Sequence, residues 1–248
     1  MANGRIAARK QVSATNTLPE IGKIKIGEKA KNASGKEYPK SLDYFRATGN
    51  FAKSFTDING DKPAMIPICF VSDNLEEVCN ERYECWEGGK RWGFGDGTTF
   101  TVWNKDKGAY EENATKDHPL VKSLKWDQML TLRFVVLNMP GILGYWSFTT
   151  KGKAVTIPSV VKAFDFVRER AQTIIGFPFN LMVEKKVGYN PGEVRNYPVV
   201  TLVPNFSQDA IDMVSNYLDQ GGNINKITTA MIEQKKVLQI DVPKQEGQ

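Results

Sequence analysis

The clearest strand signal in the chain is a pair of alternating segments, Phe177–Val187 (FPFNLMVEKKV) and Val194–Val203 (VRNYPVVTLV). Phe179, Leu181 and Val183 fall on one face of the first segment, because successive side chains of a strand point to opposite faces. Glycine, asparagine and proline in the connection between the segments are typical of a turn. We predict a half-buried antiparallel hairpin at this place.

Short aromatic strands are expected upstream, at Arg82–Glu87, Trp92–Phe94 and Thr99–Trp103. They are separated by Gly88-Gly89 and Gly95-Asp96-Gly97, which indicate hairpin turns because glycine tolerates positive φ. Further strands are predicted over residues 65–71, 129–138 and 145–149. The charged stretch 104–125 is predicted to be an irregular loop.

A helical pattern appears only later in the chain. The apolar residues between Pro158 and Gly176 recur at spacings of three and four, which predicts one mid-chain helix with a stripe of Val160, Phe164, Val167, Ala171 and Ile174. Two C-terminal helices are expected at Ser207–Leu218 and Ile224–Leu238. A brief helix or turn is expected at Asp73–Asn80, with Asp73 or Asn74 as its cap. The predicted fold class is α+β: antiparallel sheets with one mid-chain helix and two C-terminal helices.

The predicted organisation is a single α+β domain over residues 20–240, between flexible tails at 1–19 and 241–248. A subdivision of this domain near residue 126 is the alternative. The first 19 residues are polar, aperiodic and free of aromatic side chains, so they offer little to bury.

Composition excludes several classes of protein. The 248 residues are 41% hydrophobic and contain no apolar run near the 20 or so residues that a membrane span needs. Cys69, Cys79 and Cys85 are odd in number, whereas disulfides in secreted chains come in pairs. These features favour a reduced compartment, the cytosol, and no membrane partner.

The net charge of +5 is concentrated near the N-terminus. Residues 1–60 hold 11 Lys or Arg against 5 Asp or Glu, and residues 61–248 hold 22 against 23. This asymmetry points to an anionic partner such as nucleic acid, although a solvated lysine-rich surface explains it equally well. The local basic excess consists of Lys23, Lys25, Lys29, Lys31, Lys36 and Lys40.

An aromatic and basic cluster is the second candidate binding surface. Trp86, Lys90, Arg91 and Trp92 lie close together, in a stretch that also contains Tyr83, Phe94, Phe100 and Trp103. Strands that bear aromatic and cationic side chains can stack bases and neutralise phosphates, as single-strand binders do. About half of these aromatic side chains are expected in the core, because alternate residues of a strand face opposite ways.

No catalytic or metal-binding set is predicted, and no cofactor. His118 is the only histidine and lies in a polar loop. The acidic residues could bind Mg²⁺ only if three or four of them converged in space; they are Asp73, Glu76, Glu77, Glu81, Glu84, Glu87 and Asp96. The glycine-rich stretch around Asp96 lacks the Gly-Lys-Ser/Thr ending of a phosphate loop and is predicted to be a turn.

Several blocks together resemble phage-type recombination directionality factors, small proteins that accompany large serine integrases. The most specific is Gly35-Lys36-Glu37-Tyr38-Pro39 ahead of Asp43-Tyr44-Phe45, after the opening block 21–29. The later blocks are Gly95–Gly97, Leu143–Phe148, Gly176–Leu181 and Tyr197–Leu202. They follow the family's order from residue 21 to 203.

The resemblance implies a non-enzymatic switch that binds a serine integrase on DNA and redirects it from integration to excision. Many relatives carry a cysteine-rich, zinc-like segment after the Gly-Asp-Gly turn. In this chain the corresponding stretch 104–125 has no cysteine, so a metal role is unsupported. A single-stranded nucleic-acid-binding protein is the alternative function, and a carboxylate–metal nuclease or hydrolase is the third. The sequence predicts no oligomeric state.

Overall fold

The structure is a computed structural model that describes residues 18–190 and 193–227. Its strands are β1 (Glu20–Lys31), β2 (Glu37–Thr48), β3 (Met65–Cys69), β4 (Cys79–Glu87), β5 (Lys90–Gly95), β6 (Thr99–Asn104), β7 (Ala109–Thr115), β8 (Asp127–Val136), β9 (Tyr145–Thr150), β10 (Pro178–Asn190) and β11 (Glu193–Pro204). Its helices are α1 (Ala52–Asn59), α2 (Leu75–Val78), α3 (Pro119–Ser123), α4 (Thr156–Ala171) and α5 (Gln208–Asp219), followed by the 3-10 turn η1 (Ile224–Lys226).

The strands form one mixed sheet. Eight of them follow the order β11-β10-β3-β8-β4-β5-β6-β7, and β9, β1 and β2 continue from β8. Strand β8 is the junction, because it pairs with β3, β4 and β9. Strand β1 pairs in parallel with β9 and in antiparallel with β2.

The predicted α+β fold of antiparallel sheets is therefore wrong. A mixed sheet of 11 strands dominates the described chain, with 47% strand and 23% helix, and the helices number five and are mostly short. The physical reason lies in the parallel pair, which joins Gly22 to Trp146 across more than a hundred residues. Alternation of apolar and polar residues predicts a strand, but it does not predict which other strand that strand pairs with.

Elements with a strong local pattern appear where they were expected. Leu181 and Val183 on β10 are buried, and so is the α4 stripe. The side chain of Asn74 accepts a hydrogen bond from the Glu76 backbone N–H and caps α2. Gly88 and Gly89 both have positive φ at the β4–β5 turn, as a two-residue hairpin loop requires.

The polar stretch 104–125 is not an irregular loop, since it contains β7 and α3. Helix α1, which was not predicted, follows Phe51 and buries Phe55. The second C-terminal helix was expected at Ile224–Leu238, but only its first residues are described, and they form η1. The rest of that prediction, and the predicted flexibility of residues 1–17 and 241–248, lie outside the described residues.

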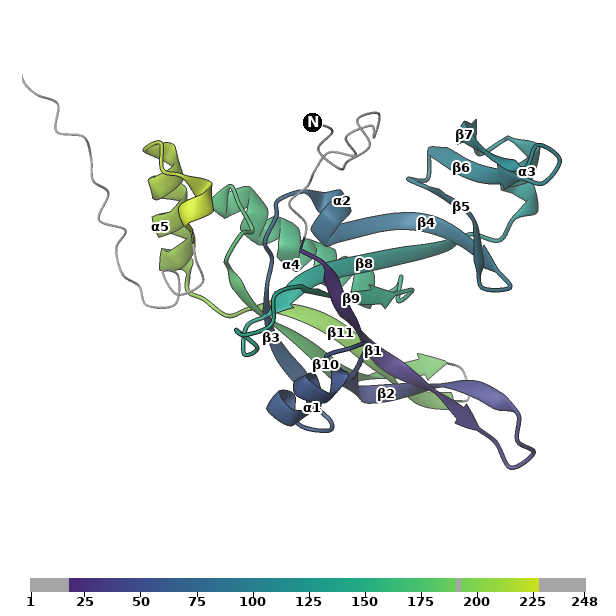
Figure 1. The fold of residues 1–248 in the computed structure, drawn as a ribbon, viewed down its shortest axis with the longest axis horizontal. Coiled ribbons are helices and arrows are strands. Elements are labelled where there is room, and N and C mark those ends of the chain that lie inside the picture. The colour runs from purple at the N-terminus through teal and green to yellow at the C-terminus, as the bar shows by residue number, and fades with distance from the viewer. Residues whose placement is uncertain (1–17, 191–192, 228–248) are drawn as a thin grey trace, which may run out of the picture.

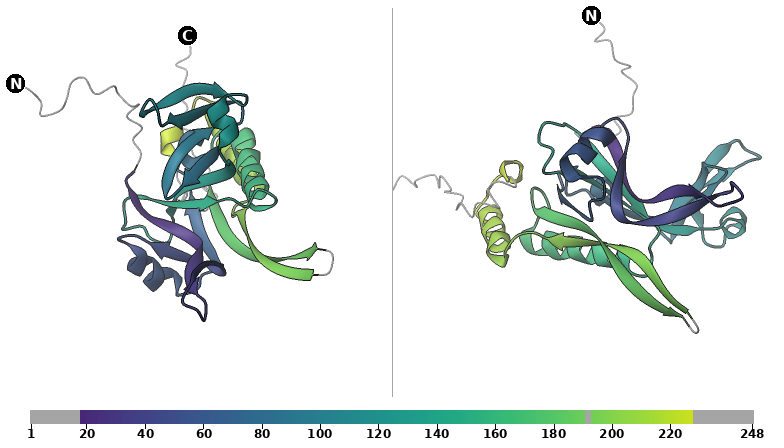
Figure 2. Two further views of the ribbon diagram at one scale, coloured as in Figure 1. Left: turned by 90° about the vertical axis from the view of Figure 1, so that its right-hand side faces the viewer. Right: turned by 90° about the horizontal axis from the view of Figure 1, so that it is seen from below.

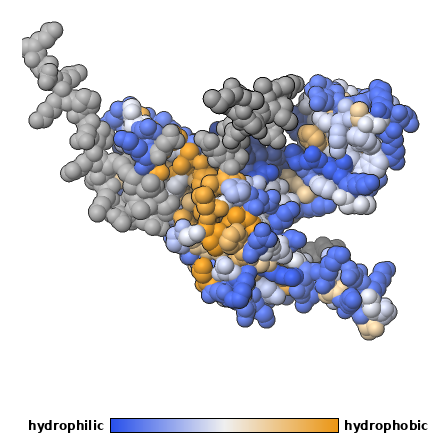
Figure 3. All heavy atoms as spheres, in the orientation of Figure 1, coloured by the Kyte–Doolittle hydropathy of each residue, from blue (hydrophilic) through white to orange (hydrophobic). Residues whose placement is uncertain are grey.

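Two buried clusters stabilise the sheet. The larger one lies between the central strands and α4, where the Phe70 ring is 5.0 Å from Phe164 and 5.7 Å from Phe179. The smaller one is formed by Phe100, Val102, Ala114 and Val121, with Trp126 against it. Hydrophobic residues also gather at the surface over the centre of the molecule, whereas the projecting parts are mostly hydrophilic (Figure 3).

Three parts project from the centre (Figures 1 and 2). The basic hairpin is β1–β2, residues 20–48. The distal lobe, residues 82–126, comprises β5, β6, β7 and α3 at the far end of β4. The third projection is the hairpin β10–β11, which leaves the body in a different direction from the distal lobe (Figure 2). None of the described helices has the length and apolarity to span a membrane.

Candidate functional site

The basic hairpin carries all six lysines that the sequence singled out, and all six are exposed. Lys25 lies opposite Arg46 in the β1–β2 ladder, so two cations stand side by side near the root of the hairpin. The register shifts between Lys25 and Gly27, where β2 contributes additional residues. Such irregularities bend and twist a ribbon.

Two of the six lysines are already neutralised. The Lys29 Nζ atom lies 3.1 Å from Glu37 Oε2, and the Lys40 Nζ atom lies 3.1 Å from Glu28 Oε1. The hydrogen bond that Lys40 donates to Glu28 raises the pKa of the Lys40 ammonium. The other four form no ion pair with the described residues: Lys23, Lys25, Lys31 and Lys36. These four are the cations available to an anionic partner.

The second set of predicted residues does come together. Trp86, Lys90, Arg91 and Trp92 line a groove on the outer face of the distal lobe, with Trp103 and Tyr110, and its volume is about 560 Å³. We call this the aromatic groove. Its four aromatic residues come from four adjacent strands, β4 to β7, and Trp103 pairs directly with Tyr110.

Specific contacts hold these aromatic rings. The Trp103 and Tyr110 rings meet edge to face with centroids 5.1 Å apart. The Tyr110 hydroxyl donates a hydrogen bond of 3.0 Å to the Arg91 carbonyl. The Lys105 ammonium lies 4.5 Å from the centroid of the Trp92 ring. A groove with fixed rings and an apolar floor is suited to binding flat or apolar groups.

Glu84 binds three side chains at the edge of the aromatic groove. It is buried on β4 and accepts hydrogen bonds from Arg82 Nε at 2.6 Å and from Trp86 Nε1 at 2.5 Å. Arg91 lies 3.9 Å from the same carboxylate. Arg82 and Arg91 also lie over the Phe94 ring, 5.1 and 4.7 Å from its centroid. Both arginines therefore share one carboxylate and stack on one ring within the lobe.

Sequence reasoning missed Arg46 and Tyr110. Arg46 is a single cation among aromatic and acidic residues, and only the register of β1–β2 places it beside Lys25. Tyr110 belongs to β7, whose sequence AYEENAT has no apolar alternation. The tyrosine itself was the available signal, since one aromatic residue in a polar stretch needs a packing partner.

The structure does not unite the two predicted sets. The lysines lie on the basic hairpin and the aromatic groove lies on the distal lobe, and these are separate projections (Figure 1). They are two surfaces, not one site.

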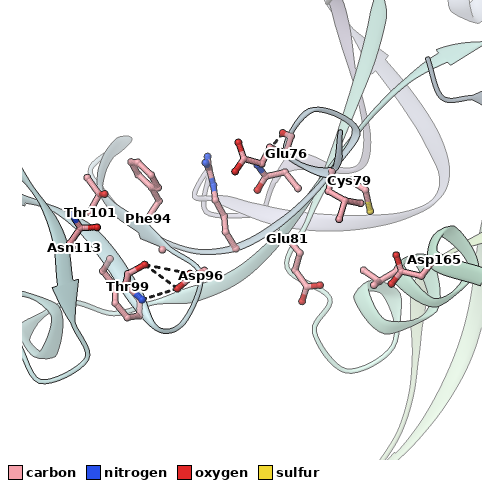
Figure 4. Close-up of a pocket in the computed structure, with 15 residues that line it drawn as sticks. Glu76, Cys79, Glu81, Phe94, Asp96, Thr99, Thr101, Asn113 and Asp165 are labelled. Atoms are coloured by element: carbon pink, nitrogen blue, oxygen red, sulfur yellow. Dashed lines mark hydrogen bonds between the residues drawn. The ribbon is translucent and has the colours of Figure 1, made fainter. Parts of the chain in front are cut away.

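Three of the seven predicted acidic residues, Glu76, Glu81 and Asp96, line a different pocket, between α2, β4, the distal lobe and α4, with a volume of about 460 Å³. Glu76, Glu81, Asp96 and Asp165 enter this region from separate elements and do not converge (Figure 4). Within the described residues, no group of three or more His, Cys, Asp or Glu could hold a metal ion.

Several of these carboxylates have structural partners. Asp96 Oδ1 accepts the backbone N–H groups of Thr98 and Thr99, each at 2.7 Å, and these bonds lower the pKa of Asp96. They close the β5–β6 turn that was predicted from the glycine-rich stretch. Asp73 accepts from the Thr173 hydroxyl at 2.8 Å and from the Ile174 N–H at 2.7 Å, which joins α2 to the end of α4.

The remaining reactive side chains are also placed structurally. His118 precedes α3, with its Nε2 atom 3.4 Å from Glu111 Oε2. Burial raises the pKa of the Cys79 thiol to about 12, so this thiol stays protonated and is a poor nucleophile at neutral pH.

Comparison with known proteins identifies one family. A family model described as Gp3-like, recombination directionality factor-like, matches residues 21–205. This range includes the basic hairpin, the distal lobe and the β10–β11 hairpin. No curated protein and no solved structure matches the chain.

Proposed function

The chain belongs to the Gp3-like, recombination directionality factor-like family, and from this premise we propose that it sets the direction of site-specific DNA recombination without cutting or joining DNA itself. It acts for a phage or another mobile element, in the cytoplasm of the bacterial host cell, by binding a serine integrase on DNA. The observation that carries the proposal is the family match, which spans residues 21–205.

A binding role is also supported by where the reactive groups lie. Glu84, Asp96 and Asp73 each have a structural partner, and the Cys79 thiol is protonated. The exposed projections instead present rings and lysines, which are groups for contact. We therefore assign the chemistry of strand exchange to the integrase.

The basic hairpin supports the DNA part of the proposal. It is a two-stranded ribbon that projects from the body and carries four lysines without an ion pair within the described residues. A ribbon of this kind can lie along a phosphate backbone, where each neutralised phosphate releases counterions.

The proposed mechanism is a shift of population. The protein has to bind the integrase arrangement that is competent for excision more tightly than the arrangement competent for integration. A preference of about 1.4 kcal/mol shifts that balance tenfold. No covalent step on this chain is needed.

The test is a recombination assay with the cognate serine integrase and both pairs of attachment-site DNA. We expect added protein to stimulate excision and to inhibit integration, because it stabilises one arrangement at the expense of the other. The control is the protein without integrase, which should leave both DNA substrates intact. Unchanged rates in both directions would reject the proposed function.

Single-stranded nucleic-acid binding is the second candidate, and the aromatic groove is the observation that favours it. The charge of the distal lobe argues against this function, because residues 82–126 hold eight Lys or Arg against seven Asp or Glu and are nearly neutral. If recombination is unaffected and the protein coats single-stranded DNA, this second function replaces the first.

A further inference from the structure

The aromatic groove is not explained by the folding of the distal lobe. The lobe has its own core on the other face of its strands, built from Phe100 and Val102 with Trp126 against them. Polar residues on the outer face would leave the packing of that core unchanged. Instead it presents three tryptophans and a tyrosine, and Trp86 is 48% exposed. Apolar side chains gathered on an outer face mark a binding surface.

The charges around the aromatic groove favour a ligand without phosphates. Arg82 and Arg91 share the single carboxylate of Glu84, and Lys107 is paired with Glu111. Lys90, which lines the groove, and Lys105, which lies over the Trp92 ring, form no ion pair with the described residues, and these two lysines do not make a continuous row of cations. A single strand carries one phosphate per nucleotide and needs a continuous track of unpaired cations. An uncharged ligand is the better complement to this groove.

Trp92, one of the residues that line the groove, has an unused hydrogen-bond donor. The Trp92 Nε1 atom is buried and has no hydrogen-bond partner among the described residues, whereas Trp86 Nε1 is bonded to Glu84. An unpaired buried donor is unfavourable, and a ligand carbonyl would satisfy it. The long side chain of Lys105 lies over the Trp92 ring, and a ligand that stacks on this ring would have to displace it.

A groove lined by aromatic rings, one of them with an unpaired indole N–H, suits one class of ligand. An extended peptide in the polyproline II conformation leaves its carbonyl groups unpaired, and its proline or apolar side chains fit between aromatic rings. We propose that the aromatic groove binds an extended, uncharged, proline-containing segment of the partner integrase. This inference rests on the proposed function, and it names the surface and the kind of segment through which the two proteins meet.

The experiment uses overlapping 15-residue peptides that tile the integrase whose recombination this protein redirects, with binding to the full chain measured by fluorescence anisotropy. At least one uncharged, proline-containing peptide should bind the wild type. Trp103→Ala should weaken that peptide about tenfold or more, as expected for a central aromatic contact. Tyr110→Ala is the second test variant, in case the first disturbs the lobe.

Two matched controls separate the groove from the lobe. Tyr83→Ala removes an exposed aromatic side chain that does not line the groove, and it should leave peptide affinity unchanged. Tyr110→Phe keeps the ring and loses only the hydroxyl, so it should bind nearly as the wild type does. Indole N–H resonances provide a direct readout, because the Trp92 signal should shift when the peptide binds.

Three results would overturn the inference: no peptide binds, peptides bind wild type and Trp103→Ala equally, or a dT15 oligonucleotide binds with the same loss on Trp103→Ala. The last result would make the groove a single-strand site. These failures are distinct from failure of the proposed function. A protein that redirects recombination while no peptide binds refutes this inference alone, whereas a protein that redirects nothing refutes the proposed function.

Discussion

The distal lobe and the basic hairpin project from the same sheet, but they are built in opposite ways. The lobe buries a small core of its own and is nearly neutral. The hairpin holds seven Lys or Arg against four Asp or Glu over residues 20–48, and none of residues 29–41 is buried. A buried core holds the surface above it in one shape. A two-stranded ladder without a core fixes only the direction in which the hairpin projects. The lobe is suited to recognising shape and the hairpin to contacting charge.

Removing a ring from the lobe core should have the largest effect. Phe100 is buried and its ring centroid is 4.7 Å from that of Trp126. Phe100→Ala should lower the free energy of unfolding of the lobe by about 3–5 kcal/mol, through lost burial and the cavity left behind. Native-state hydrogen exchange should show amides of β5, β6 and β7 losing protection while β3 and β10 keep theirs.

The matched control for that variant is on the hairpin. Tyr38 is 45% exposed, and Tyr38→Ala should change the free energy of unfolding by less than about 0.5 kcal/mol. If Phe100→Ala reduced protection equally throughout the chain, the lobe would not be a separate unit of stability. The comparison between the two projections would then fail.

An intermediate effect is expected at the buried carboxylate of the lobe. Glu84→Ala removes hydrogen bonds to Arg82 and Trp86, and it should destabilise the protein by about 1.5–3 kcal/mol, the range for bonds to a charged group. Urea unfolding measures the change. Glu87→Ala, an exposed position on the same strand, is the control and should be nearly neutral. Equal effects would mean that burial at position 84 contributes nothing.

The smallest effect on stability, with a clear effect on DNA binding, is expected at the hairpin. The triple variant Lys23→Gln, Lys25→Gln and Lys31→Gln should leave the free energy of unfolding within about 0.5 kcal/mol. It should reduce the slope of log affinity against log salt for attachment-site duplex by about 2–3, since each lost phosphate contact accounts for roughly 0.9.

The control for the lysines lies on the lobe. Lys116→Gln, Lys122→Gln and Lys125→Gln remove the same charge from another exposed surface. They should leave the salt slope as it is in the wild type. A slope that falls equally in both triple variants would mean that net charge, and not the hairpin, governs binding to DNA.

The differences between prediction and structure follow the same division. Patterns that are local were interpreted correctly: the α4 stripe, the Asn74 cap and the Gly88-Gly89 turn each depend on residues close in sequence. The parallel pairing of β1 with β9 was missed, because it depends on contacts that no local period encodes. The fold class was wrong for that reason.

The candidate surfaces were foreseen in part. The clustering of Trp86, Lys90, Arg91 and Trp92 follows from short strands joined by tight turns, so their neighbourhood could be predicted. The ion pairs that neutralise Lys29 and Lys40 could not be predicted, because they depend on which residue lies across the β1–β2 ladder. Tyr110 was missed because a polar edge strand resembles a loop in sequence.

The parallel pairing of β1 with β9 has a consequence for synthesis on the ribosome. The β1–β2 hairpin is local and can form as soon as residue 48 has emerged, but β9 ends at residue 150. At translation rates of about 5–20 residues per second, the hairpin waits roughly 5–20 s for its partner strand. During that interval the outer edge of β1 is unpaired, and closing so long a loop is slow. The basic hairpin is thus made before the distal lobe and fixed in place after it.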